Sequence, residues 1–208
     1  MTQQDKAQER RRLAGLALEL TAKRGHEITP DVLAAETGLS RARVDAIFPE
    51  ENDLFDAIAE QWFTPLIDIM EEVIGTDLPA NRKFYEFFAR RFIYLRNEYT
   101  RDRDTFALLC ELGGRRFERV RSFVDLADHY TCELIAQAQD EGAFQGLEID
   151  RALTIVNQMV IAYTNPDIML MVGDRLAEDK LAAIVDTMFA GLSARDGGSS
   201  GMSGLRAT

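Results

Sequence analysis

Two arginines, Arg41 and Arg43, lie in a short segment whose pattern suits contact with double-stranded DNA. A guanidinium group presents parallel N–H donors that match O6 and N7 of guanine in the major groove. We expect these arginines on the outward side of a helix of about eight residues that starts at Ser40 and lies in the groove. The outward positions of that helix hold Arg41, Ala42, Arg43, Asp45 and Ala46.

The residues around this helix predict the elements that position it. Thr29-Pro30 is a helix start, because threonine accepts from free N–H groups of the first turn and proline is tolerated at the first helical position. Gly38 suits a turn that needs a positive φ, Ser40 caps the second helix, and Pro49 ends it. A helix-turn-helix also needs a small residue where its helices cross and apolar residues beneath them, and these are Ala34, Leu33, Leu39, Val44 and Ile47.

An ordinary helical hairpin has the same pattern, so the distribution of charge matters. Residues 1–49 carry eight Lys/Arg against seven Asp/Glu, whereas the whole chain has a net charge of −11. A near-neutral N-terminal part that includes Arg10, Arg11 and Arg12 permits DNA contact there, and the acidic remainder disfavours it elsewhere. A second basic cluster is interpreted as a solvated face paired with Glu111, Glu118 and Asp125, and it holds Arg115, Arg116, Arg119 and Arg121.

Helical spacing of apolar residues continues through the rest of the chain, and no run shows sustained strand alternation, so we predict an all-α protein. Pro65 is expected to end or kink the fourth helix, and Gly113-Gly114 to stop the sixth. We divide the chain into a DNA-binding domain (1–50), an effector-binding and dimerisation domain (51–195) and a Gly/Ser-rich, disordered tail (196–208). Helices are predicted near residues 10–24, 30–37, 40–48, 51–65, 84–95, 106–112, 120–142, 150–165 and 174–192.

The N-terminal 50 residues resemble the TetR family of bacterial transcriptional regulators. The residues that carry the resemblance are Leu16-Ala17-Leu18-Glu19-Leu20, Gly25, Thr29, the run Leu33 to Ser40, Phe48-Pro49 and Leu54. The resemblance implies a nine-helix homodimer whose first three helices bind operator DNA. The DNA-contacting residues would be Arg10, Arg11, Arg12, Thr29, Ser40, Arg41, Ala42, Arg43, Asp45 and Ala46.

Two positions depart from the family pattern and bear on DNA affinity. Asp45 stands where the family usually has a tyrosine, and Glu51 where it usually has a phosphate-contacting lysine. A carboxylate beside a phosphate is repelled, which weakens binding. Asp45 has two interpretations: it accepts a hydrogen bond from cytosine N4, or it pairs with Arg41 one turn back. We expect the pairing.

The resemblance also implies a small-molecule pocket enclosed by helices five to seven, for which we expect an apolar or weakly acidic effector. Arg91 either holds an acidic effector or extends its charge outward to an exposed carboxylate. Asn157 and Tyr163 either orient a ligand or lie in a dimer interface. The predicted pocket residues are Phe84, Phe88, Arg91, Phe92, Phe106, Cys110, Phe123, His129, Asn157 and Tyr163.

The last two helices are implied to form a homodimer interface through Ile155, Met159, Leu181, Ile184, Val185, Met188 and Phe189. Together these patterns predict a regulator, with repression the expected role, that a small molecule releases from its operator. The alternative is a TetR-shaped carrier of small molecules or lipids that has lost DNA binding; Asp45, Glu51 and the acidic charge favour it.

Other functions receive little support from the sequence. His129 and Cys132, with Cys110, suggest a metal site only weakly, and cysteines more often pack as small apolar residues, so we expect no metal and no cofactor. The chain has two histidines and lacks catalytic signatures such as Gly-x-Ser-x-Gly, which argues against an enzyme. The longest uncharged stretch, 152–166, is too short and polar for a membrane span, and with no secretory signal the expected location is the cytoplasm.

Overall fold

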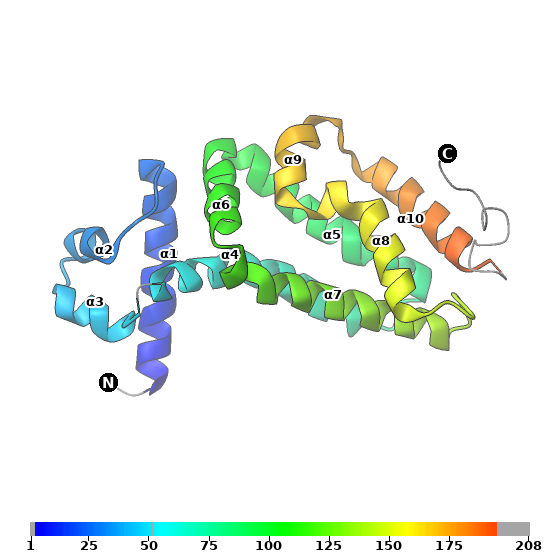
Figure 1. Ribbon diagram of the computed structural model, residues 1–208, viewed down its shortest axis with the longest axis horizontal. Coiled ribbons are helices and arrows are strands. Elements are labelled where there is room, and N and C mark those ends of the chain that lie inside the picture. The colour runs from blue at the N-terminus through cyan, green and yellow to red at the C-terminus, as the bar shows by residue number, and fades with distance from the viewer. Residues whose placement is uncertain (1–2, 51, 195–208) are drawn as a thin grey trace, which may run out of the picture. The chain divides into compact units, whose positions relative to one another are not determined.

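The computed structural model describes residues 3–50 and 52–194 (Figure 1). Within these ranges the ordered elements are all helical, which confirms the all-α prediction, and the predicted disordered tail lies outside them. No helix there has the length and apolar character needed to cross a bilayer. The elements are α1 (Gln3–Arg24), α2 (Pro30–Thr37), α3 (Arg41–Ile47), α4 (Asp53–Ile74), α5 (Ala80–Arg101), α6 (Arg103–Arg115), α7 (Phe117–Asp140), α8 (Ile149–Thr164), α9 (Pro166–Val172), the short 3₁₀ helix η1 (Gly173–Arg175) and α10 (Glu178–Leu192).

The described residues form ten α-helices, one more than the nine expected. The additional helix is α9, which the sequence reading treated only as the place where the preceding helix ends. The Asn165 side chain accepts a hydrogen bond from the Ile168 N–H (3.0 Å), and Pro166 occupies the first helical turn. Proline has no backbone N–H, but an N–H in the first helical turn has no acceptor within the helix, so proline costs no hydrogen bond there. Pro166 therefore begins a helix.

Two helices continue past residues that were expected to stop them. Of the two outcomes expected at Pro65, an end or a kink, the end is wrong: α4 continues to Ile74, and its apolar stripe is buried through Leu66, Met70 and Val73. The helix α6 runs through Gly113 and Gly114 to Arg115. Burial of an amphipathic face contributes more to helix stability than the propensity of single residues, so these breakers weaken the helices without ending them.

The contacts within the chain define two compact units. Among the described residues, the first joins 3–50 and 52–65 to 100–123, and the second joins 66–99 to 124–194. The first unit thus contains the predicted DNA-binding segment together with α6 and the beginning of α7.

The core of the first unit holds α2 and α3 against α1 (Figure 1). Leu13 and Ala17 of α1, Leu33 of α2, and Val44 and Ile47 of α3 are all 2% exposed or less. The turn between α2 and α3 contains Gly38 at φ +67°, in the left-handed region that the sequence predicted. A side-chain-bearing residue is strained there, whereas glycine is not.

Long-range ion pairs add to this core. Arg116 makes a bidentate pair with Glu27 (2.7 and 3.0 Å), and its guanidinium lies 4.6 Å from the centroid of the Phe55 ring. Arg119 lies 3.5 Å from an Asp56 carboxylate oxygen. The predicted local pairing is therefore correct for Arg115 with Glu111 and for Arg121 with Glu118, and wrong for Arg116 and Arg119.

The second unit has an aromatic core. The rings of Phe84 in α5, Phe144 in the loop after α7 and Phe189 in α10 contact one another with centroids 4.9–5.6 Å apart. Phe92 packs edge-to-face on Tyr163 of α8 (5.0 Å). The buried Lys83 ammonium donates to the Ile74 carbonyl (3.1 Å) and to the Gln137 side chain (2.7 Å), so its charge is hydrogen-bonded.

Alanine substitution should have opposite effects at two glycines. Gly38→Ala places a Cβ in a left-handed residue and should lower the free energy of unfolding by about 1–2 kcal/mol. Gly113 lies in a helix, and a Cβ added there would meet no neighbouring atom. Gly113→Ala should therefore raise the free energy of unfolding by about 0.5–1 kcal/mol. Urea unfolding measures both changes; a stabilising Gly38→Ala would contradict the turn geometry.

The Arg116–Glu27 pair should contribute more to the free energy of unfolding than an exposed ion pair does. Arg116→Gln should lower the free energy of unfolding by about 1–2 kcal/mol, because it leaves a half-buried carboxylate without its cation. The control Arg121→Gln breaks an exposed pair and should change it by less than about 0.5 kcal/mol. Equal effects of the two variants in urea unfolding would show that the long-range pair has no special role.

Candidate nucleic-acid interface

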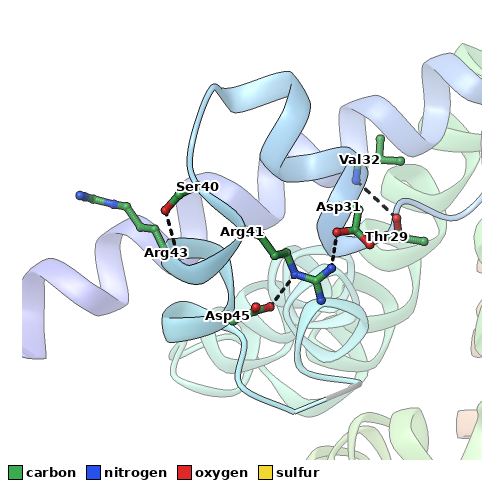
Figure 2. Close-up of polar contacts among 7 residues, drawn as sticks. All are labelled: Thr29, Asp31, Val32, Ser40, Arg41, Arg43 and Asp45. Atoms are coloured by element: carbon green, nitrogen blue, oxygen red, sulfur yellow. Dashed lines mark hydrogen bonds and ion pairs between the residues drawn. The ribbon is translucent and has the colours of Figure 1, made fainter.

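The helices α2 and α3 each begin at a hydroxyl cap. The Thr29 hydroxyl accepts from the Val32 N–H (3.4 Å), and the Ser40 hydroxyl accepts from the Arg43 N–H (3.3 Å) (Figure 2). Both residues therefore act as the helix caps that the sequence predicted. Their oxygens satisfy backbone donors that would otherwise lack partners at a helix start.

The outward side of α3 is as predicted. Val44 and Ile47 are buried against α1 and α2, so the other residues of α3 face solvent. Because this helix is only seven residues long, two inward positions leave five outward ones. The exposed residues are Arg41, Ala42, Arg43, Asp45 and Ala46.

Arg41 is held between two carboxylates. Its Nε donates to Asp45 Oδ1 (2.7 Å), which confirms the predicted pairing, and its Nη1 donates to Asp31 in the first turn of α2 (Figure 2). These hydrogen bonds, first to Asp31 and then to Asp45, raise the pKa of Arg41 above its ordinary value. One cation between two anions gives this part of the surface a net charge of −1.

Arg43 has a different environment. Its side chain is exposed and points away from the Arg41 cluster (Figure 2). Among the described residues, no hydrogen bond or ion pair engages its guanidinium. Its charge does help to lower the pKa of Glu9, but the hydrogen bond and charge of Arg12 have larger effects. Arg43 is thus the cation of α3 whose donors are available to a ligand.

The three N-terminal arginines lie inside α1 and differ in availability. Arg10 donates to the Asp53 carbonyl (3.2 Å) and lies over the Phe48 ring, so it connects α1 to the residues after α3. Arg12 makes a bidentate pair with Glu9 (2.9 Å for both bonds). Arg11 is exposed. Of the two predicted departures from the family pattern, Asp45 is described above and Glu51 lies outside the described residues.

The predicted effector-pocket residues divide between the two units. In the first unit, Phe106 contacts Trp62 and Phe123 stacks on Phe63, with Cys110 half-buried. In the second unit His129 is exposed, and the buried residues are Phe84, Phe88, Arg91, Phe92 and Tyr163. Asn157 donates to Asp128 of α7 (2.8 Å). No group of three or more His, Cys, Asp or Glu side chains in the described ranges is placed to hold a metal ion.

The predicted interface residues of α8 and α10 have unequal exposure. Leu181, Val185 and Met188 are at most 2% exposed in the single chain, since they pack into its own core. Met159 is 38% exposed, and Ile161, which the sequence reading did not select, is 45% exposed. Ile155, Ile184 and Phe189 are half-buried.

Comparison with known proteins agrees with this architecture. A family model described as the C-terminal domain of tetracycline-repressor-like proteins matches residues 80–185, half of the chain. The chain belongs to the TetR family. A search of functionally characterised proteins found no match to this TetR-family sequence.

Two solved structures share the fold. The TetR family transcriptional regulator PfmR from Thermus thermophilus is 17% identical, with a TM-score of 0.55, over 86% of this chain and 97% of that one. The transcriptional regulator FadR from Bacillus subtilis, solved in complex with stearoyl-CoA, is 14% identical, with a TM-score of 0.59, over 88% of this chain and 96% of that one. At these identities the likeness concerns the fold alone.

Removing one carboxylate beside Arg41 should strengthen DNA binding. Asp45→Asn releases a hydrogen-bonding site of Arg41 and removes a negative charge from the outward side of α3. Binding to a duplex of about 30 base pairs should tighten, and the plot of log affinity against log salt should steepen by about 0.9 for each bound copy, which corresponds to one additional phosphate contact per copy. Fluorescence anisotropy measures both quantities.

Glu60→Gln is the matched control for this experiment. It makes the same change in net charge at an exposed position on α4, away from α3 in the sequence, and should leave the salt slope unchanged. Equal slopes for Asp45→Asn and the wild-type chain would mean that the Arg41 cluster does not face the duplex.

Proposed function

We propose that this TetR-family chain is a transcriptional regulator that binds operator DNA through α3 and acts as a repressor. The observation that carries the proposal is the exposed guanidinium of Arg43 on a helix whose opposite side is buried and whose start is capped. A side chain in this position, on the second helix of a helix-turn-helix, reaches base edges when the helix enters the major groove.

The regulator is proposed to act as a homodimer. Two copies of α3 must lie about 34–36 Å apart to enter successive turns of the same groove, so a dimer would recognise an inverted repeat. Met159 and Ile161 leave apolar surface exposed on α8 that a partner would cover, which supports a protein contact on that helix.

Release from DNA is proposed to follow binding of a small molecule in the region that the family model matches. A ligand shifts the equilibrium toward a DNA-incompetent form only by its difference in affinity for the two forms. The similar FadR structure contains stearoyl-CoA, which supports a small-molecule site in this fold. The expected effector here is apolar or weakly acidic.

A carrier that has lost DNA binding is the second candidate, and one observation favours it. Arg41 is paired with Asp31 and Asp45, so an outward cation of α3 is offset by two anions, in a chain whose net charge is −11. Exposed ion pairs contribute only about 0–1 kcal/mol, however, so a phosphate or guanine can replace a carboxylate at Arg41 with little loss. Because Arg41 can exchange a carboxylate for DNA in this way, the regulator is the stronger candidate.

Removing the Arg43 side chain should distinguish a DNA-binding regulator from a carrier that has lost DNA binding. The duplex would span the region upstream of the chain's own gene, with the affinity measured at two salt concentrations. Arg43→Ala should weaken binding about tenfold or more, because each copy loses a base contact of about 1–3 kcal/mol. Arg121→Ala removes another exposed arginine, from α7, and should have no effect. Absence of wild-type binding at low salt would reject the regulator and leave the carrier.

A further inference from the structure

The second unit contains a buried cation without a matching anion. Arg91 of α5 is 9% exposed, and its Nε is fully buried with no hydrogen-bond partner among the described residues. The adjacent Arg90 differs: it is more exposed, yet it makes a bidentate pair with Glu72 (2.6 and 3.1 Å). The more deeply buried of two neighbouring arginines is therefore the one without an ion pair.

The groups around Arg91 compensate its charge only in part. Its guanidinium lies 5.2 Å from the centroid of the Phe87 ring, a favourable but weak contact. The Asp128 carboxylate attracts the Arg91 guanidinium but lies beyond ion-pair distance. One oxygen of that carboxylate accepts a hydrogen bond from the Asn157 side chain (2.8 Å). Burial lowers the pKa of Arg91 to about 10, with Asp128 opposing the change.

A buried guanidinium is stable only where its donors and charge are matched, because desolvation of an unpaired ion costs several kcal/mol. Ionisable groups perturbed in this way are concentrated at functional sites, so Arg91 marks a candidate binding site. The best match to a guanidinium edge is a carboxylate, which accepts two parallel N–H bonds. A dianionic phosphate would place two negative charges near Asp128, so a single negative charge fits the local balance better.

We infer that Arg91, with Phe87, Asp128 and Asn157 around it, binds the carboxylate of an apolar monocarboxylic acid. The apolar character follows from the buried aromatic residues next to Arg91 on α5, Phe88 and Phe92, and from Tyr163 of α8 against Phe92. This inference rests on the proposed function, since it gives the chemical class of the effector. It also assigns a role to Asn157, which orients the Asp128 carboxylate.

The test is a thermal-shift series on the full chain without DNA. The probes are straight-chain carboxylic acids of about 4 to 16 carbons with benzoate and phenylacetate, each beside its alcohol. An acid present at about 100 times its Kd should raise the Tm by about 5–10 °C, and the matching alcohol should not. The Arg90→Met control should keep the shift, and Arg91→Met should lose it through at least tenfold weaker binding.

A second measurement separates a ligand site from a purely structural arginine. Without added acid, Arg91→Met should keep or raise the Tm, since an apolar side chain of similar length replaces an unmatched buried charge. A structural Arg91 would give a lower Tm. The inference is overturned if no acid shifts the wild-type Tm, if the shift survives Arg91→Met, or if Arg91→Met lowers the Tm without ligand.

The outcomes also distinguish this inference from the proposed function. Acid binding at Arg91 by a chain that fails to bind duplex DNA supports the site and rejects the regulator. DNA binding with no response to any acid supports the regulator and rejects the carboxylate site. Where both hold, saturating acid should weaken DNA binding in the wild-type chain and leave Arg91→Met unaffected.

Discussion

Burial of one side of α3 is the constraint on which the DNA-binding surface depends. Val44 and Ile47 are packed beneath the helix against Leu13 and Leu33, and none of the four is more than 2% exposed. With its inner side fixed in this way, a seven-residue helix has no freedom to turn its arginines inward. The left-handed Gly38 and the cap at Ser40 then set where α3 begins, and the cap at Thr29 sets where α2 begins.

The positions of the Asp and Glu side chains determine which arginines are available to bind DNA. Arg12, Arg24 and Arg41 each pair with carboxylates of the first unit, so they add little net positive charge to its surface. Arg43 is exposed like them, but no carboxylate of the described residues pairs with it. Non-specific DNA affinity depends on the number of phosphates neutralised, whereas sequence preference depends on individual base contacts. On α3, where Arg41 is paired and Arg43 is not, this arrangement favours selective over general binding.

Local signals in the sequence predicted the helix-turn-helix closely, because every feature acts within four residues. A hydroxyl at a cap, a glycine at a positive φ and apolar residues at helical spacing all leave a pattern along the chain. The Arg41–Asp45 pair, one turn apart, was predicted for the same reason. The start of α9 was missed because Asn165-Pro166 was interpreted only as a helix end.

Contacts between distant residues could not be predicted. The pairs Arg41–Asp31 and Arg116–Glu27 join elements whose relative placement depends on the packed core. Arg91 illustrates the same limit: the sequence left open whether it holds an acidic effector or extends to an exposed carboxylate, and only the surrounding helices determine that it is buried. Burial and pairing of a charged side chain are properties of the packed core, and a single sequence carries no direct signal for them.

The most direct test of the α3 surface is selection of bound duplexes from a random-sequence library by the full chain. We predict enrichment of an inverted repeat whose half-sites lie one helical turn apart, with a guanine in each half-site that is no longer selected by a chain with alanine at position 43. Enrichment of no sequence, or of the same sequence by both chains, would contradict a base-reading role for Arg43 and with it the proposed recognition through α3.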